Sequence, residues 1–123
     1  MVQSLQTSRT ITNFANTSNP KPDDLIVYIS GAWDVVRIEH LEMLKKAKTS
    51  EKNVFLYVGV WDDEMIKFYK GEKPKLSLQE RVQILLACKW VDDVVIGAPY
   101  EVTNDLNKSL GIQKILDNEV EKQ

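Results

Sequence analysis

The sequence contains very few of the residues that build metal sites and disulfides: one cysteine, Cys88, and one histidine, His40. A single cysteine excludes a disulfide within the chain and is typical of a reducing compartment. A zinc site needs a cluster of cysteine and histidine ligands, and the sequence has none. We therefore assign no residue as a protein ligand of a metal.

Long apolar runs and an excess of basic residues are also missing. The longest apolar run, Val54 to Trp61, is far shorter than the ~20 residues that span a bilayer, so no membrane span is expected. The formal net charge of −2 argues against nucleic-acid binding through a basic surface. The first residues lack a charged region followed by an apolar core, so no secretory signal is expected and a cytoplasmic location is favoured.

What remains is the composition of one globular domain. Of the 123 residues, 43% are hydrophobic and 28% are charged, which is ordinary for a chain with a sizeable core. Residues 1–22 are rich in Ser, Thr, Asn and Gln and end with Pro20 and Pro22. They indicate a linker or an N-terminal arm, and the domain is expected over residues 23–123.

Charge-free apolar runs alternate with helical periodicity along this domain. The runs predict strands over 25–29, 54–60, 94–96 and 113–116. Caps and periodicity predict helices over about 38–48, 63–70, 78–89 and 104–110, and the charged residues 117–123 are expected to fray. Alternating strands and helices indicate an α/β fold, a Rossmann-like parallel sheet with flanking helices. Ligands bind such sheets at the carboxyl ends of the strands.

The stretch from Tyr28 to His40 joins the first strand to the first helix. Gly31 is expected to allow a sharp turn and a close backbone approach. Free N–H groups and the helix dipole make such a junction an anion site. Within the helix, an apolar face is predicted from four residues at helical spacing: Ile38, Leu41, Leu44 and Ala47.

This stretch carries a resemblance to a known family. Its residues Gly31-Ala32-Trp33-Asp34-x-x-Arg37-Ile38-Glu39-His40 resemble the Gly-x-Phe-Asp-x-x-His-x-Gly-His signature of the cytidylyltransferases. Residues 68–71, 78–81 and 87–103 follow in family order. The last segment is most similar to the second, C-terminal cytidylyltransferase-like domain of ethanolamine-phosphate cytidylyltransferases. The similarity covers roughly residues 24–116 and implies a fold of the nucleotidyltransferase type.

The resemblance implies a parent enzyme that joins CTP and phosphoethanolamine, with Mg²⁺, into CDP-ethanolamine and pyrophosphate for phosphatidylethanolamine synthesis. Such an enzyme would work in the cytoplasm, with the endoplasmic reticulum surface as a further expectation. Arg37 replaces the first motif histidine, Glu39 replaces the glycine, and Asp117-Asn118 replaces a His-Gly or His-Asp pair. The family's later Arg-Thr-x-Gly-x-Ser-Thr segment does not occur before Gln123.

These departures predict a degenerate second domain, truncated before the family's last motif and inactive on its own. The alternative is a non-catalytic nucleotide-binding or dimerisation module of the same fold. Glu39 is the most damaging change, because a carboxylate facing phosphates repels them. The same acid in a first helical turn is favoured by the helix dipole.

The resemblance also implies roles for individual residues. The catalytic positions are His40 and Arg37, and the substrate-facing positions are Asp34 and Trp33. The nucleotide-binding positions are Gly31, Ala32, His40, Lys70 and Arg81. Structural alternatives stay open: His40 as a local cap, Arg37 as a solvated side chain, Asp34 as a turn residue and Trp33 as a core residue.

Three further residues are expected at a domain contact: Trp90, Val91 and Tyr100. Aromatic side chains are the class that anchors interfaces. The partner would be the first catalytic domain of the parent chain, or a second copy in a homodimer. The alternative is that both aromatic residues belong to the core.

Overall fold

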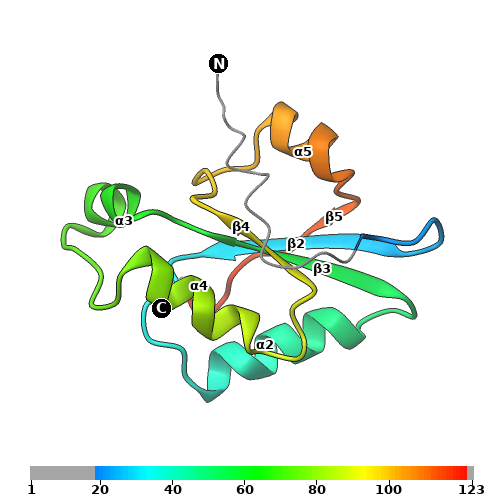
Figure 1. Ribbon diagram of the computed structural model, residues 1–123, viewed down its shortest axis with the longest axis horizontal. Coiled ribbons are helices and arrows are strands. Elements are labelled where there is room, and N and C mark those ends of the chain that lie inside the picture. Colours follow the sequence, from blue (N-terminus) through cyan, green and yellow to red (C-terminus); the bar gives the residue numbers. More distant parts are fainter. Residues whose placement is uncertain (1–18, 122–123) are drawn as a thin grey trace.

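The computed structural model describes residues 19–121. The predicted arm lies outside these residues except for its last four, as do the final two residues of the tail. The described elements in chain order are β2 Leu25–Gly31, α2 Ile38–Thr49, β3 Val54–Val60, α3 Asp63–Lys70, α4 Leu78–Leu86, β4 Asp93–Ile96, α5 Asn104–Leu110 and β5 Lys114–Ile115 (Figure 1).

Four parallel strands form one sheet in the order β4-β3-β2-β5. The predicted α/β class, with a parallel sheet and flanking helices, is confirmed. The chain builds outward from β2 to β4 and then returns to the other side of β2 with β5. The strand order therefore reverses between β2 and β5, where sheets of this kind bind ligands at the carboxyl ends of their strands.

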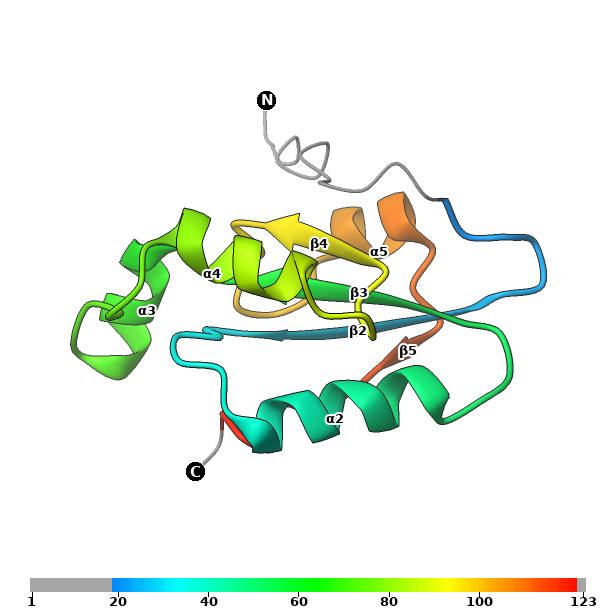
Figure 2. The ribbon, with the colours of Figure 1, turned by 60° about the horizontal axis from the view of Figure 1, so that its bottom comes forward.

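Helices cover both faces of the sheet, with α5 on one side and α2 on the other (Figure 2). Alternate residues of β2 supply the two cores: Val27 and Ile29 pack with α2 and α4, and Tyr28 packs with α5. All seven residues of β3 are buried, as expected for a central parallel strand covered on both faces.

The ends of three helices follow the predicted caps. Asp62 accepts from the Met65 N–H at 2.8 Å at the start of α3, and Gly71 ends that helix with φ 87°. Ser77 opens α4 through its capping box with Glu80, and Thr103 caps α5. However, α4 ends at Leu86 rather than near Lys89, because the chain turns so that Asp92 accepts from the Leu56 N–H at 2.7 Å.

The apolar face predicted for α2 is partly wrong. Ile38 and Leu41 are 66% and 37% exposed. The buried residues of α2 are instead His40, Leu44 and Ala47. The difference arises in the first turn, where the indole of Trp33 lies 5.7 Å from the His40 ring and covers it.

The tail expected to fray is ordered over the described residues 117–121. Asn118 is buried and donates to the Ser30 carbonyl oxygen at 3.1 Å. After β5 this segment crosses the carboxyl end of β2 and reaches the start of α2, as the red trace in Figure 2 shows. Across residues 19–121, we find no helix with the length and apolar character needed to cross a membrane.

Candidate functional site

The turn after β2 depends on two residues with different roles. Trp33 takes the left-handed conformation, with φ 53°, which is strained for a bulky side chain and is often found at functional sites. Gly31 instead permits a close approach, since an added Cβ would lie 2.3 Å from Asn118 Nδ2. The sharp turn predicted for Gly31 thus belongs to Trp33, and the close approach at Gly31 is to the tail.

Trp33 does not face a ligand. Its side chain is fully buried, and its indole N–H donates to the Gly59 carbonyl oxygen at 2.9 Å. The substrate-facing assignment of Trp33 is therefore corrected to the core alternative. The buried Trp33 side chain packs in the core and thereby supports the turn after β2.

Asp34 holds the loop between α3 and α4 against this turn. Its carboxylate oxygens accept from the Lys75 N–H at 2.8 and 2.9 Å and from the Leu76 N–H at 2.9 Å. The same side chain borders a cavity with Arg37 and His40. Asp34 is thus a loop anchor that also lies at the expected substrate surface.

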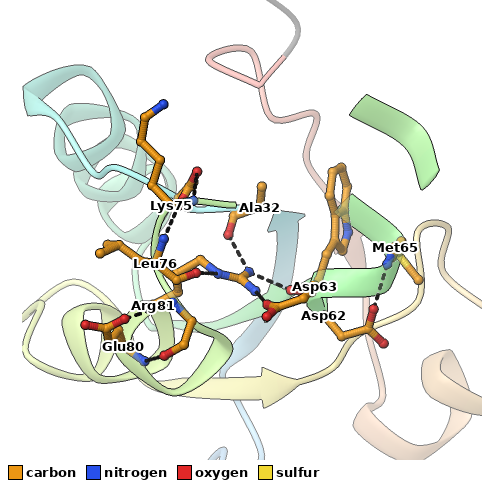
Figure 3. A network of polar contacts seen from close by, with 11 residues as sticks. Ala32, Asp62, Asp63, Met65, Lys75, Leu76, Glu80 and Arg81 are labelled. Atoms are coloured by element: carbon orange, nitrogen blue, oxygen red, sulfur yellow. Dashed lines mark hydrogen bonds and ion pairs between the residues drawn. The ribbon is translucent and has the colours of Figure 1, made fainter. Parts of the chain in front are cut away.

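Arg81 is buried next to the cavities and connects several segments of the chain through its hydrogen bonds. Its guanidinium lies between the ends of β2 and β3, with the Asp63 carboxylate 2.5 Å from Nη2 (Figure 3). The backbone acceptors are the carbonyl oxygens of Ala32 at 2.8 Å, Trp61 at 2.6 Å and Leu76 at 3.1 Å. Arg81 has no exposed surface, so its nucleotide-binding assignment is corrected: it positions the strand ends.

His40 and Arg37 form a reciprocal cap at the start of α2. The Arg37 N–H donates to His40 Nδ1 at 3.0 Å, and the His40 N–H donates to the Arg37 carbonyl oxygen at 3.0 Å. Because Nδ1 accepts, the neutral ring carries its proton on Nε2. The expected local cap is therefore present, and it fixes the tautomer that offers Nε2–H as a donor.

The charge state of His40 follows from its surroundings. Burial lowers the pKa of His40 from its usual 6.5, the negative charges of Glu121 and Glu39 oppose this change, and Arg37 adds to it. The ring is thus neutral near pH 7, which suits a hydrogen-bond donor rather than a fixed positive charge.

Two adjoining cavities lie at the carboxyl ends of the strands. The first, of about 480 Å³, is bordered by Ala32, Arg37 and His40. The second, of about 620 Å³, is bordered by the aromatic residues Trp61, Tyr69 and Tyr100. Lys70 and Glu121 border both. Backbone, cationic and imidazole donors therefore surround the first cavity, and aromatic rings surround the second.

The acidic residues that border the two cavities are Asp34, Glu72 and Glu101, together with Asp117 and Glu121 of the tail. Glu39 is exposed and borders neither cavity, so the expected repulsion from Glu39 is weakened by solvent. Glu121 instead accepts from the Ala32 N–H at 3.1 Å through Oε1 and forms an ion pair with Lys70 through Oε2. Among residues 19–121, no three acidic, histidine or cysteine side chains gather to hold a metal ion.

The three expected interface residues are not brought together. Trp90 and Val91 precede β4 and pack partly against the core beside α2 and α4. Tyr100 follows β4 and stacks on Tyr69 with ring centroids 3.8 Å apart. The strand separates the two groups, so a single contact patch containing all three is not formed in this structure.

Several site residues were not found from the sequence: Asn118, Glu121, Trp61, Tyr69 and Asp63. Trp61 directly follows β3, and Asp63 begins α3 two residues later, so their position at a carboxyl end was a usable signal. Glu121 gave no such signal, because its acceptor role depends on a contact with Ala32 across 89 residues of sequence.

Known proteins resemble this chain over most of its length. The family model described as cytidylyltransferase-like matches residues 28–118. An ethanolamine-phosphate cytidylyltransferase from Dictyostelium discoideum is 42% identical over 113 residues, which are 91% of this chain and 31% of that protein. The ethanolamine-phosphate cytidylyltransferase from Arabidopsis thaliana is 39% identical, over 94% of this chain and 27% of the Arabidopsis protein.

Two further comparisons concern smaller proteins and the fold. An FAD synthase from Pyrococcus horikoshii is 40% identical over 68% of this chain and 55% of its own. The crystal structure of a lipopolysaccharide core biosynthesis protein from Thermoplasma volcanium has a TM-score of 0.64 at 21% identity, over 74% of this chain and 71% of that one. This likeness shows the fold. The chain spans less than a third of the ethanolamine-phosphate relatives described above.

Proposed function

The chain belongs to the cytidylyltransferase-like family, and we propose that it is the degenerate second domain of an ethanolamine-phosphate cytidylyltransferase. The parent enzyme would make CDP-ethanolamine and pyrophosphate from CTP and phosphoethanolamine. Relatives of that name match nearly the whole of this chain, which supports the substrate class.

The gathering of anion-binding groups at the end of β2 carries this proposal. The Ala32 N–H, the Lys70 ammonium and the His40 ring meet around adjoining cavities at the point where the strand order reverses. Ala32 and His40 belong to the junction between β2 and α2, and Lys70 belongs to the end of α3. The Ala32 N–H and the Lys70 ammonium both contact the Glu121 carboxylate, which supports their role as groups that hold an anion.

In nucleotidyl transfer, an oxygen of phosphoethanolamine attacks the α-phosphorus of CTP and pyrophosphate leaves. The protein's task is to hold the phosphates and stabilise the charge that develops on their oxygens. The Ala32 N–H and His40 Nε2–H would donate to these oxygens, and Lys70 would neutralise them. Arg37, in place of a histidine, offers a charged fork that reaches a different position.

Mg²⁺ is proposed as part of the CTP substrate, because Mg²⁺ at nucleotide sites is held largely by phosphate oxygens and water. It would offset the negative charge of the phosphates. The residues that border the cavities would then act on the Mg²⁺–CTP complex as a whole, and the cationic Lys70 borders both cavities.

The alternative is a non-catalytic module that binds a nucleotide weakly or pairs with another domain. The ion pair between Lys70 and Glu121 favours this alternative, because the pair engages a cation that phosphates require. The partner would be the first catalytic domain of the parent or a second copy, with Trp90, Val91 and Tyr100 acting at separate contacts.

Pyrophosphate release tests the catalytic part of the proposal. With CTP, phosphoethanolamine and Mg²⁺, we expect this chain to release no more pyrophosphate than its His40→Ala variant. Calorimetry with CTP should give a dissociation constant no tighter than about 0.1 mM. Turnover that His40→Ala abolishes would show that the domain is active rather than degenerate.

Second-domain status is tested separately by the full open reading frame. It should encode another cytidylyltransferase domain, upstream of this one, with an intact His-x-Gly-His motif. A frame without such a domain would contradict the proposed place in the parent enzyme.

A further inference from the structure

The carboxylate of Glu121 lies where the proposed site would hold a phosphate. One oxygen accepts from the Ala32 N–H at 3.1 Å, and the other pairs with the Lys70 ammonium. The Glu121 side chain is only 14% exposed, and the Lys70 side chain is 39% exposed. The carboxylate is therefore shielded from water more than the cation with which it pairs. The bound group is thus an anion supplied by the chain itself.

The segment that carries Glu121 is anchored at a defined place. The Asn118 side chain donates to the Ser30 carbonyl oxygen at 3.1 Å and accepts from the Glu121 N–H at 2.9 Å. The anchor fits because Gly31 has no Cβ at the point of closest approach. Two side chains of one segment therefore contact three successive residues, Ser30, Gly31 and Ala32.

We propose that residues 117–121 form an internal blocking segment, in which Glu121 must leave the Ala32 N–H and Lys70 before a phosphate binds there. The proposal rests on the proposed function, because it takes the same donors to be the anion site. It adds that the site opens and closes by movement of this segment about β5.

Charge and geometry make the two occupants mutually exclusive. A phosphate and a carboxylate compete for the same N–H and the same ammonium, and their like charges repel at short range. The blocked state lowers apparent affinity by the fraction of molecules in which the segment is closed. A segment that is closed in about nine molecules of ten would lower the apparent affinity about tenfold.

Calorimetry with inorganic pyrophosphate tests the block directly. We expect Glu121→Gln to bind pyrophosphate about tenfold tighter than the unaltered chain, and Glu121→Ala to bind at least as tightly. Glu119→Gln is the matched control, because Glu119 is exposed in the same segment and its loss changes net charge by the same amount. The control should bind like the unaltered chain.

The Ala32 amide provides a second measurement. Its nuclear magnetic resonance signal should shift on Glu121→Gln substitution and shift again when pyrophosphate is added to that variant. Equal, measurable pyrophosphate binding by the unaltered chain and Glu121→Gln would overturn the block and leave the proposed function standing. Tightening by Glu119→Gln to the same extent would assign the effect to net charge and also overturn it. Failure of every variant to bind would overturn both.

Discussion

Arg81 Nη1 donates to the carbonyl oxygen of Ala32 at 2.8 Å, across 49 residues of sequence. The same nitrogen donates to the Trp61 carbonyl oxygen at 2.6 Å. One side chain of α4 thereby ties together the residues that follow β2 and β3. The site is built on this connection, because Ala32 also supplies the N–H that contacts Glu121.

Replacing Arg81 should destabilise the fold strongly. Arg81→Met leaves the buried carbonyl oxygens of Ala32 and Trp61 without their donors, and each such loss costs about 1–3 kcal/mol. We expect the free energy of unfolding to fall by about 3 kcal/mol, measured by urea denaturation. The control, Arg37→Met, alters an exposed arginine and should stay within about 0.5 kcal/mol. A loss below about 1 kcal/mol for Arg81→Met would contradict this connecting role.

Removing the Asp34 carboxylate should release the loop before α4. Asp34→Ala deletes the acceptor for the Lys75 and Leu76 N–H groups, so we expect faster hydrogen exchange at these two amides. The free energy of unfolding should fall by about 1–2 kcal/mol, because the Lys75 and Leu76 N–H groups lose their acceptor and water replaces it only in part. Asp23→Ala, at an exposed position, is the control. Unchanged exchange at Lys75 and Leu76 would show that the loop is held by other contacts.

The sequence predicts Glu39 as the charge that opposes anions, whereas we propose this role for Glu121. We therefore expect Glu39→Gly to leave pyrophosphate affinity unchanged within about twofold, in contrast to Glu121→Gln. The glycine should instead weaken α2 by about 1 kcal/mol. Calorimetry and urea denaturation separate the two effects. A gain in affinity equal to that of Glu121→Gln would restore Glu39 as the opposing charge.

High pH should unfold the domain through its buried tyrosines. Burial raises the pKa of Tyr57 to about 12, with the Asp93 charge adding to the rise, and burial also raises the pKa of Tyr28. An unfolded tyrosine titrates near pH 10. The stabilisation is therefore complete below pH 10 and is lost as the pH rises toward 12. Tyrosinate absorbance should appear together with loss of the circular dichroism signal; tyrosinate forming in a folded chain below the unfolding transition would contradict this.

Local patterns were sufficient to predict the layers of the fold. Apolar runs such as Val54–Val60 and caps such as Asp62 and Ser77 act within a few residues, so they are visible in the sequence. Contacts between segments that are far apart in the sequence could not be predicted in this way. Trp33 was assigned to the substrate surface because the family resemblance implies a substrate-facing aromatic residue at its position. Its burial under α2 depends on the bond to Gly59, and the tail's order depends on Ser30.

Three residues of the predicted site lie around the cavities for the same reason, and their roles there stay predictions. His40, Lys70 and Ala32 lie around the cavities because each sits near the carboxyl end of a strand or at a helix terminus. Arg81 was assigned to the nucleotide because the family resemblance implies a phosphate contact at its position. The structure instead surrounds it with three carbonyl acceptors and Asp63, none of which lies within four residues of Arg81 in sequence.

The pairing of Gly31 with Val60 places Ala32 and Trp61 at the same level as they leave the sheet. Arg81 contacts both carbonyl oxygens with one nitrogen. A slip of β2 against β3 by one residue would move one oxygen by about 3.3 Å, beyond the reach of a shared donor. The hydrogen bonds of Arg81 therefore form only when β2 and β3 pair in the native register. A chain that pairs the two strands in another register leaves these buried groups without partners.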